Sequence, residues 1–171
     1  ADSEGAAYIF ERDNNGDWGN AVSNQTYRTE TTKLKASDSG TGSLERFGCS
    51  VSINGDHAMV GADGIDIVET NDVGAVYKFQ RTVDGSWNQE SIIIRANDAA
   101  ESDAFGSDVA LADNYAIVGA GGVNTYAGAV YIISPSAVTT VTPTTLTFDT
   151  NTLTIENIID ANDTDAISFG L

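Results

Sequence analysis

Apolar and polar residues alternate along most of this chain with the two-residue period of β-strands. In the strand expected over residues 74–81, Tyr77 and Phe79 share one face, with a polar residue between them. Asn54-Gly55 and Asp84-Gly85 interrupt the alternation, and dipeptides of this kind are typical of tight turns between paired strands. No segment keeps the 3.6-residue apolar period of a helix. The pattern therefore predicts an all-β protein of short antiparallel strands.

The same pattern recurs along the chain. Residues 47–62 align without gaps with residues 105–120, so equivalent positions lie 58 residues apart (105 − 47 = 58). Further landmarks recur in a constant order: Gly-Ala-x-Tyr motifs at Gly5, Gly74 and Gly128, Phe-Gly pairs at Phe47, Phe105 and Phe169, turn tryptophans at Trp18 and Trp87, and linker aspartates at Asp38, Asp98 and Asp163. Because several motifs recur in one order, the chain consists of repeats of a single structural unit.

Each unit contains four expected strands, here named A to D and joined by short turns. Four-stranded antiparallel units of this length, arranged around an axis, form the blades of β-propellers. The Phe-Gly that begins strand A, the Gly-Ala that ends strand B and the Gly-Ala-Val-Tyr of strand C resemble the FG-GAP repeat of integrin α-subunits and large secreted bacterial proteins. The linker at residues 33–38 is most similar to the bacterial repeats. The resemblance covers residues 5–133 and implies β-propeller-type blades, about two and a half FG-GAP repeats in all.

The phase of the repeat divides the chain into four parts. Residues 1–46 would form a half blade of strands C and D, residues 47–104 a complete blade, and residues 105–137 strands A to C of a further blade. Residues 138–171 are Thr-rich and end with Phe169-Gly170, which is in phase with the earlier repeats. A half blade has an unpaired inner edge, and such edges favour pairing with another chain. We therefore expect the terminal strands of one copy to pair with the N-terminal strands of a neighbouring copy.

Composition narrows the range of partners. The 171 residues include 8 Lys and Arg against 25 Asp and Glu, which gives a formal net charge of −17. This charge repels phosphate backbones and anionic lipid headgroups, so we expect neither nucleic-acid binding nor membrane attachment. The chain has no uninterrupted apolar stretch of the length that spans a bilayer. A single cysteine excludes an intramolecular disulfide framework, and an acidic, cysteine-poor composition is compatible with an extracellular or cell-surface location.

Candidate metal ligands lie in two acidic loops. Integrin-type repeats carry a calcium loop between strands A and B, but here that connection is only a short turn, at Asn54-Gly55-Asp56 and at Asp113-Asn114. Weak candidates for a looser oxygen cage follow strand B, namely Asp63, Asp66, Glu69, Asn71 and Asp72. A solvated acidic loop is the favoured interpretation of these residues. Residues 13–17 resemble the first half of an EF-hand loop without its final glutamate, and a hairpin turn is the simpler interpretation. We expect no bound metal ion and no cofactor.

Candidate catalytic groups are few. His57 is the only histidine, and Cys49 is expected on strand A, where a small thiol packs as an apolar side chain. A Cys49–His57 pair would have to form across a hairpin. With 25 carboxylates in the chain, paired acids carry no information about a glycosidase-like site. The sequence contains no phosphate-binding loop or dinucleotide-binding motif, so it predicts no enzymatic activity.

Two further features concern the surface. Trp18 and Trp87 occupy equivalent positions beside the C–D turn, where they could form a carbohydrate platform or pack one blade on the next. Their equivalence favours the structural role. Asn24 and Asn162 begin glycosylation sequons.

Two functions remain for a chain of this kind. The unpaired half blade and the lack of a chemical site favour a structural extracellular module that assembles with copies of itself, head to tail, into a fibre. The family resemblance favours an alternative, an adhesion propeller that binds a protein or glycan through its loops and is part of a longer propeller.

Overall fold

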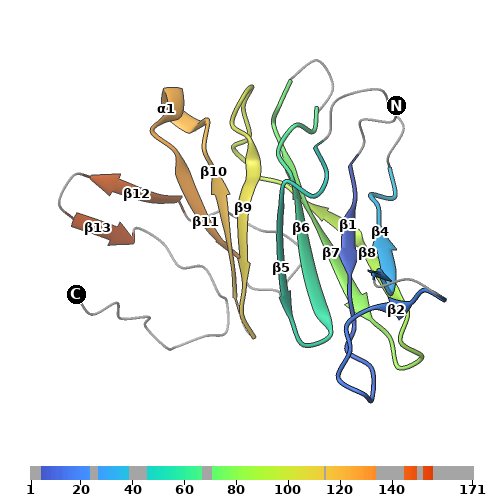
Figure 1. Ribbon diagram of the computed structural model, residues 1–171. Coiled ribbons are helices and arrows are strands. Elements are labelled where there is room, and N and C mark those ends of the chain that lie inside the picture. The colour runs from blue at the N-terminus through green and yellow to red at the C-terminus, as the bar shows by residue number, and fades with distance from the viewer. Residues whose placement is uncertain are drawn as a thin grey trace.

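The computed structural model describes residues 5–23, 27–38, 46–66, 71–113, 115–133, 145–149 and 152–155, the last two as backbone only (Figure 1). The strands are β1 (Ala7–Ile9), β2 (Asn20–Ala21), β3 (Arg28–Thr29), β4 (Thr32–Leu34), β5 (Ser50–Asn54), β6 (His57–Ala62), β7 (Ala75–Arg81), β8 (Trp87–Ile94), β9 (Phe105–Leu111), β10 (Ala116–Ala120), β11 (Ala129–Ile133), β12 (Thr145–Asp149) and β13 (Thr152–Ile155). The all-β fold class with blade-like antiparallel sheets, expected from the alternation, is confirmed.

The central sheet has the strand order β5-β6-β7-β8, with every neighbouring pair antiparallel. Asn54 pairs with His57 around the tight turn that Asn54-Gly55 predicts, and Gly55 adopts a φ of 56° there. The sheet is therefore one complete four-stranded blade, with β5 as its strand A and β8 as its strand D.

The following sheet has the order β9-β10-β11-β12-β13. Its first three strands repeat β5 to β7, whereas a hairpin of β12 and β13 takes the place of the single strand D. Leu146 of β12 pairs with Val130 of β11 within the same chain, and β13 forms the outer edge among the described strands. The Thr-rich segment is thus partly paired in cis, and its pairing with another copy stays a prediction.

The first sheet is smaller. It consists of β1 and β4, paired in the register Ala7↔Leu34, while β2 and β3 form a separate short hairpin between them along the chain. Among the described strands, β1 therefore has a neighbour on one side only.

The first, central and five-stranded sheets pack face to face, with the central sheet in the middle (Figure 1). One core lies between the first and central sheets and includes Leu34, Phe47 and Tyr77. A second core lies between the central sheet and the five-stranded sheet and includes Met59 and Phe105. Strands β5 and β9 are also linked by polar bonds, since the amide of Leu111 donates to the Ser52 hydroxyl at 2.9 Å.

The segment labelled α1 (Val123–Tyr126) is a single turn rather than a regular helix, because Asn124 and Thr125 have φ values of 52° and 58°. Within the described residues, no helix has both the length and the apolar content needed to cross a bilayer.

Candidate functional site

The sheets meet at a junction that occurs twice in the same form. Gly5 forms a parallel bridge with Phe47, and Gly74 forms one with Phe105. A Cβ atom on Gly5 would lie 2.0 Å from the Phe47 carbonyl oxygen, and one on Gly74 would lie 2.1 Å from that of Phe105. Both glycines have a positive φ, of 83° and 86°. Only glycine combines this conformation with so close an approach of two backbones.

Each junction phenylalanine also packs within its own sheet. The ring of Phe47 meets Tyr77 edge to face with 5.3 Å between centroids, and Phe105 meets Tyr131 in the same way at 5.2 Å. Such pairs contribute about 0.5–1.5 kcal/mol beyond the burial of their area. Each Phe-Gly thus joins two sheets, through its backbone to the preceding one and through its ring to the following one.

The linker aspartates complete these junctions. The Tyr77 hydroxyl donates to Asp38 at 2.9 Å, and the Tyr131 hydroxyl donates to Asp98 at 3.2 Å. Burial, and then the charge of Asp98, raises the pKa of Tyr131 above its usual value. Sequence reasoning missed this role, although the recurrence of an aspartate before each Phe-Gly was a usable signal.

The first sheet has the same motif without these partners. Tyr8 is 52% exposed, whereas the equivalent Tyr77 is 0% exposed and Tyr131 is 2% exposed. No described phenylalanine packs on the ring of Tyr8, which instead has the ammonium of Lys33 5.4 Å from its centroid. The difference arises from the neighbours, because the three tyrosines share one local motif.

The central sheet is uncovered beside this tyrosine. Val51 on β5 is 61% exposed, while Val109, its equivalent on β9, is 6% exposed. Strands β5 and β6 of the central sheet cover Val109, and no described strand covers Val51. The open area lies between β1 and β5, next to the edge of β1 that lacks a partner among the described strands.

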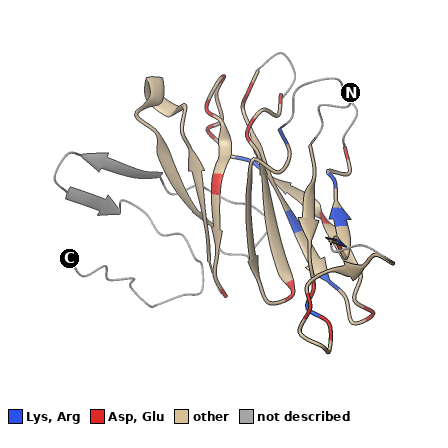
Figure 2. Ribbon diagram, viewed as in Figure 1, with Lys and Arg blue, Asp and Glu red and all other residues tan. Residues whose placement is uncertain are grey.

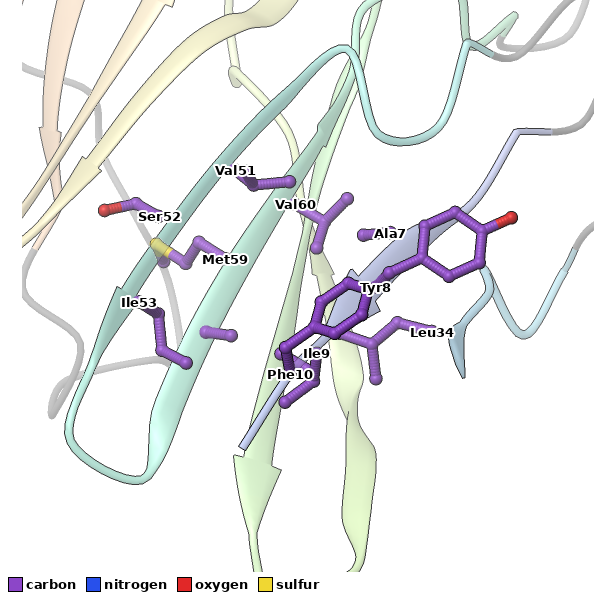
Figure 3. A pocket seen from close by; sticks show the side chains of 11 residues that line it. Ala7, Tyr8, Ile9, Phe10, Leu34, Val51, Ser52, Ile53, Met59 and Val60 are labelled. Carbon is purple, nitrogen blue, oxygen red and sulfur yellow. The ribbon is translucent and has the colours of Figure 1, made fainter. Parts of the chain in front are cut away.

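This open area forms an apolar groove of about 320 Å³. Figure 3 shows Tyr8 and Phe10 from β1 and its C-terminal extension on one side, with Val51 and Ile53 of β5 on the other. None of the eleven lining residues is charged, although the molecule carries a net charge of −17. In Figure 2 most of the ribbon positions coloured for Asp and Glu lie in turns at the ends of the strands. We call this area, defined by Tyr8, Phe10, Val51 and Ile53, the open face.

The weak metal candidates do not come together as a site in the described part of the chain. Asp63 is buried and lies 3.3 Å from the guanidinium of Arg46, and its Oδ1 has no hydrogen-bond partner among the described groups. Asp66 accepts a hydrogen bond from the amide of Asp72 at 2.9 Å. Glu69 lies outside the described residues. Within the described ranges, no group of three or more acidic, histidine or cysteine side chains is arranged to hold a metal ion.

The EF-hand-like segment is a hairpin turn. Asp13 accepts from the backbone amides of Asn15 and Asp17 at 2.8 and 2.9 Å, and the amide of Asp17 is the main cause of its lowered pKa. The carboxylate of Asp13 thus organises the turn itself. An equivalent turn follows β7, where the Asp84 carboxylate accepts from the amide of Ser86 at 3.0 Å.

Cys49 and His57 lie at opposite ends of the β5–β6 hairpin, separated by the five residues of β5, or roughly 16 Å. The sulfur of Cys49 contacts the Gly106 carbonyl oxygen at 3.4 Å. Loss of surrounding water raises the pKa of this thiol, and the charge of Asp63 adds to the effect. A protonated thiol is a poor nucleophile, and the histidine is not positioned to deprotonate it.

The two tryptophans differ in exposure, as Tyr8 and Tyr77 do. Trp87 packs beside the first core, and its indole N–H lies 3.3 Å from Glu11 of the first sheet. Trp18 is 59% exposed, with the guanidinium of Arg12 5.8 Å from its ring. Trp87 therefore has the inter-sheet role that the repeat suggests. The sequons at Asn24 and Asn162 lie outside the described residues.

A family model described as FG-GAP repeat matches residues 29–79 and 87–133, which together make up more than half of the chain. The second match runs from the start of β8 to the end of β11, and the first likewise ends in β7, the strand C of its sheet. Each match therefore includes one Phe-Gly pair together with the linker aspartate before it and the tyrosine that its ring contacts. No curated protein matches the chain.

Proposed function

The chain belongs to the FG-GAP repeat family, and from this premise we propose that it is a non-enzymatic extracellular structural module that associates head to tail with further copies of itself. FG-GAP repeats are typical of extracellular or surface proteins. The likeness of residues 33–38 to linkers of secreted bacterial members supports the same setting.

The exposure of Val51 carries the proposal. The same valine of the repeat is covered at position 109 by a neighbouring sheet and lies open at position 51, beside an edge of β1 that no described strand pairs with. A contiguous apolar face next to free backbone donors and acceptors is a template for another β-sheet.

The free energy that contacts at the open face could contribute is comparable to the cost of association. Burying a side chain as large as valine or phenylalanine contributes about 1.5–3 kcal/mol, and each satisfied backbone hydrogen bond adds about 1 kcal/mol. The four residues of the open face and a few β1 hydrogen bonds would therefore offset an association cost estimated at about 4–15 kcal/mol. Residual negative charge on the outer turns would keep assembled copies from aggregating sideways.

The test is the mass of the full chain over a range of concentrations, measured by light scattering after size exclusion. We expect mass to rise with concentration. Val51→Lys should keep the chain monomeric, because a lysine on the open face cannot be desolvated cheaply. Val83→Lys is the matched control, since Val83 lies fully exposed in the β7–β8 turn, and it should assemble like the unmodified chain.

A chain that stays monomeric at high concentration would overturn self-association. The adhesion alternative would then take its place, with a protein or glycan as the ligand of the open face or of the loops.

A further inference from the structure

We infer that the joint between copies is a third Phe-Gly junction, in which Phe169-Gly170 of one copy lies between Gly128 of the same copy and Tyr8 of the next. This inference rests on the proposed self-association and names the residues that would make it. Phe169 and Gly170 lie outside the described residues, so the argument starts from the two junctions that are described.

Both described junctions follow one rule. Phe47 lies against Gly5 with its backbone and against Tyr77 with its ring. Phe105 does the same with Gly74 and Tyr131. Each Phe-Gly therefore needs a left-handed glycine on the preceding sheet and a tyrosine on the following sheet.

Gly128 is the glycine half of a third junction. Its φ is 80°, and its amide donates to the Val123 carbonyl at 3.0 Å, as that of Gly74 donates to the Ile65 carbonyl at 3.0 Å. Ile65 and Val123 are themselves equivalent in the repeat (123 − 65 = 58). A Cβ atom on Gly74 would lie 2.1 Å from the Phe105 carbonyl oxygen. A Cβ atom on Gly128 would have only the Ala120 carbonyl oxygen, at 3.8 Å, near it among the described atoms.

Tyr8 is the tyrosine half. It occupies the same motif position as Tyr77 and Tyr131, yet its ring meets no described phenylalanine and its hydroxyl makes no hydrogen bond to a described residue. It lies on the open face, next to the edge of β1 that no described strand pairs with.

The spacing of the C-terminal segment fits both halves. Phe169 follows Gly128 by 41 residues (169 − 128 = 41), close to the 42 between Gly5 and Phe47 (47 − 5 = 42). Asp163 precedes Phe169 by six residues (169 − 163 = 6), near the seven between Asp98 and Phe105 (105 − 98 = 7). Asp163 would accept the hydroxyl hydrogen of Tyr8 from the next copy, as Asp38 accepts that of Tyr77.

The joint uses different surfaces on the two copies. Phe169, Gly128 and Asp163 belong to one copy, and Tyr8 belongs to the next. A contact of this kind repeats without self-complementarity, so it generates a ring or an open filament according to the rotation between copies.

Complementary variants test the assignment. Phe169→Ala removes the ring from one end of the chain and Tyr8→Ala removes its partner from the other, so each variant alone should stay monomeric. An equimolar mixture should form heterodimers and nothing larger, because each variant keeps one intact end. Tyr126→Ala changes an exposed tyrosine in a turn and should assemble like the unmodified chain.

Two matched pairs refine the test. Asp163→Ala should weaken association about tenfold to a hundredfold, as expected for one hydrogen bond to a charged acceptor, while Asp165→Ala should not. Gly128→Ala should abolish association, whereas Gly55→Ala introduces a side chain at a positive φ with no described atom within 4 Å and should not. Circular dichroism of dilute samples confirms that each variant is folded.

The outcomes separate the two proposals. If the unmodified chain does not associate, the proposed function fails. If it associates and both Phe169→Ala and Tyr8→Ala associate equally well, the proposed function stands and this junction is wrong. A variant mixture that stays monomeric while the unmodified chain assembles also overturns the junction.

Discussion

Single residues of the repeat are set by close approach between sheets. Gly74 must be glycine because a phenylalanine carbonyl occupies the position of its Cβ, and Phe105 must be aromatic because its ring fills the space beside Tyr131. The linker Asp98 then holds the tyrosine hydroxyl. The residues of the repeat motif thus contact one another at a single junction, although they come from three separate segments of the chain.

Gly74→Ala should lower the free energy of unfolding by about 2–5 kcal/mol, because backbone strain and a backbone clash add. Gly55→Ala carries similar strain without a clash and should cost about 1–2 kcal/mol. Urea denaturation of dilute chain measures both. Equal losses would show that the inter-sheet approach is unimportant for stability.

Tyr131→Phe should change the pH dependence of stability. The pKa of Tyr131 is raised in the folded chain, while an unfolded tyrosine ionises near pH 10. The raised pKa of Tyr131 therefore contributes fully to the free energy of unfolding below about pH 10, and this contribution is lost as the pH rises further toward the folded pKa. The variant should lose about 1.5–3 kcal/mol of stability at pH 7, from the missing hydrogen bond to the Asp98 carboxylate, and its stability should decline less steeply above pH 10. Thermal melts from pH 8 to 11 would reveal this, and identical slopes would contradict it.

At the scale of elements, equivalent strands have different surroundings. Strand β9 lies under the central sheet, so Val109 is buried, whereas β5 presents Val51 to the open face. The ties between the first and central sheets are partly polar, with Arg81 of β7 2.8 Å from Glu11. The first sheet is therefore tied to the central sheet at both ends of β1, through Glu11 at one end and through the Gly5–Phe47 bridge at the other.

Val109→Ala should cost about 2–3 kcal/mol, since it removes two buried methyl groups and leaves a cavity. Val51→Ala, the same change at the equivalent position, should cost under about 0.5 kcal/mol in the monomer. Chemical denaturation at concentrations where the chain is monomeric gives both values. A large loss for Val51→Ala would mean that the open face is covered within one copy.

Across the described part of the molecule, most of the Asp and Glu positions coloured in Figure 2 lie in turns, whereas the cores between the sheets are apolar. Two of the acidic loops use carboxylates locally, as Asp13 and Asp66 accept amide hydrogens of their own turns. Folding of the described sheets therefore draws on packing and backbone pairing.

Chelation should accordingly leave the melting temperature of the full chain unchanged within about 2 °C. The turns after β5 and β9 are too short to supply the six to eight oxygen ligands of calcium. Differential scanning calorimetry with and without chelator measures the effect. A fall of about 5 °C or more, which corresponds to about 1–2.5 kcal/mol in a chain of this size, would reveal a metal site.

The sequence by itself determined the all-β class, the repeat and its turns. The class and the turns are local properties, because alternation specifies a strand and Asn54-Gly55 specifies a tight hairpin. The repeat can be read from the 58-residue offset, which shows which positions of the units are equivalent. The positions of the junction glycines and phenylalanines were also visible in the sequence, although their partners were not.

Only the tertiary structure decided which equivalent residues are covered. Tyr8 and Tyr77 share one motif, as Val51 and Val109 do, yet one member of each pair is exposed and the other buried. Burial depends on the neighbouring sheet, which comes from segments far away in the chain. The bond from Tyr77 to Asp38 spans 39 residues for the same reason. Periodicity assigns a side chain to a face, but the sheet that packs against that face determines whether it is core or a binding surface.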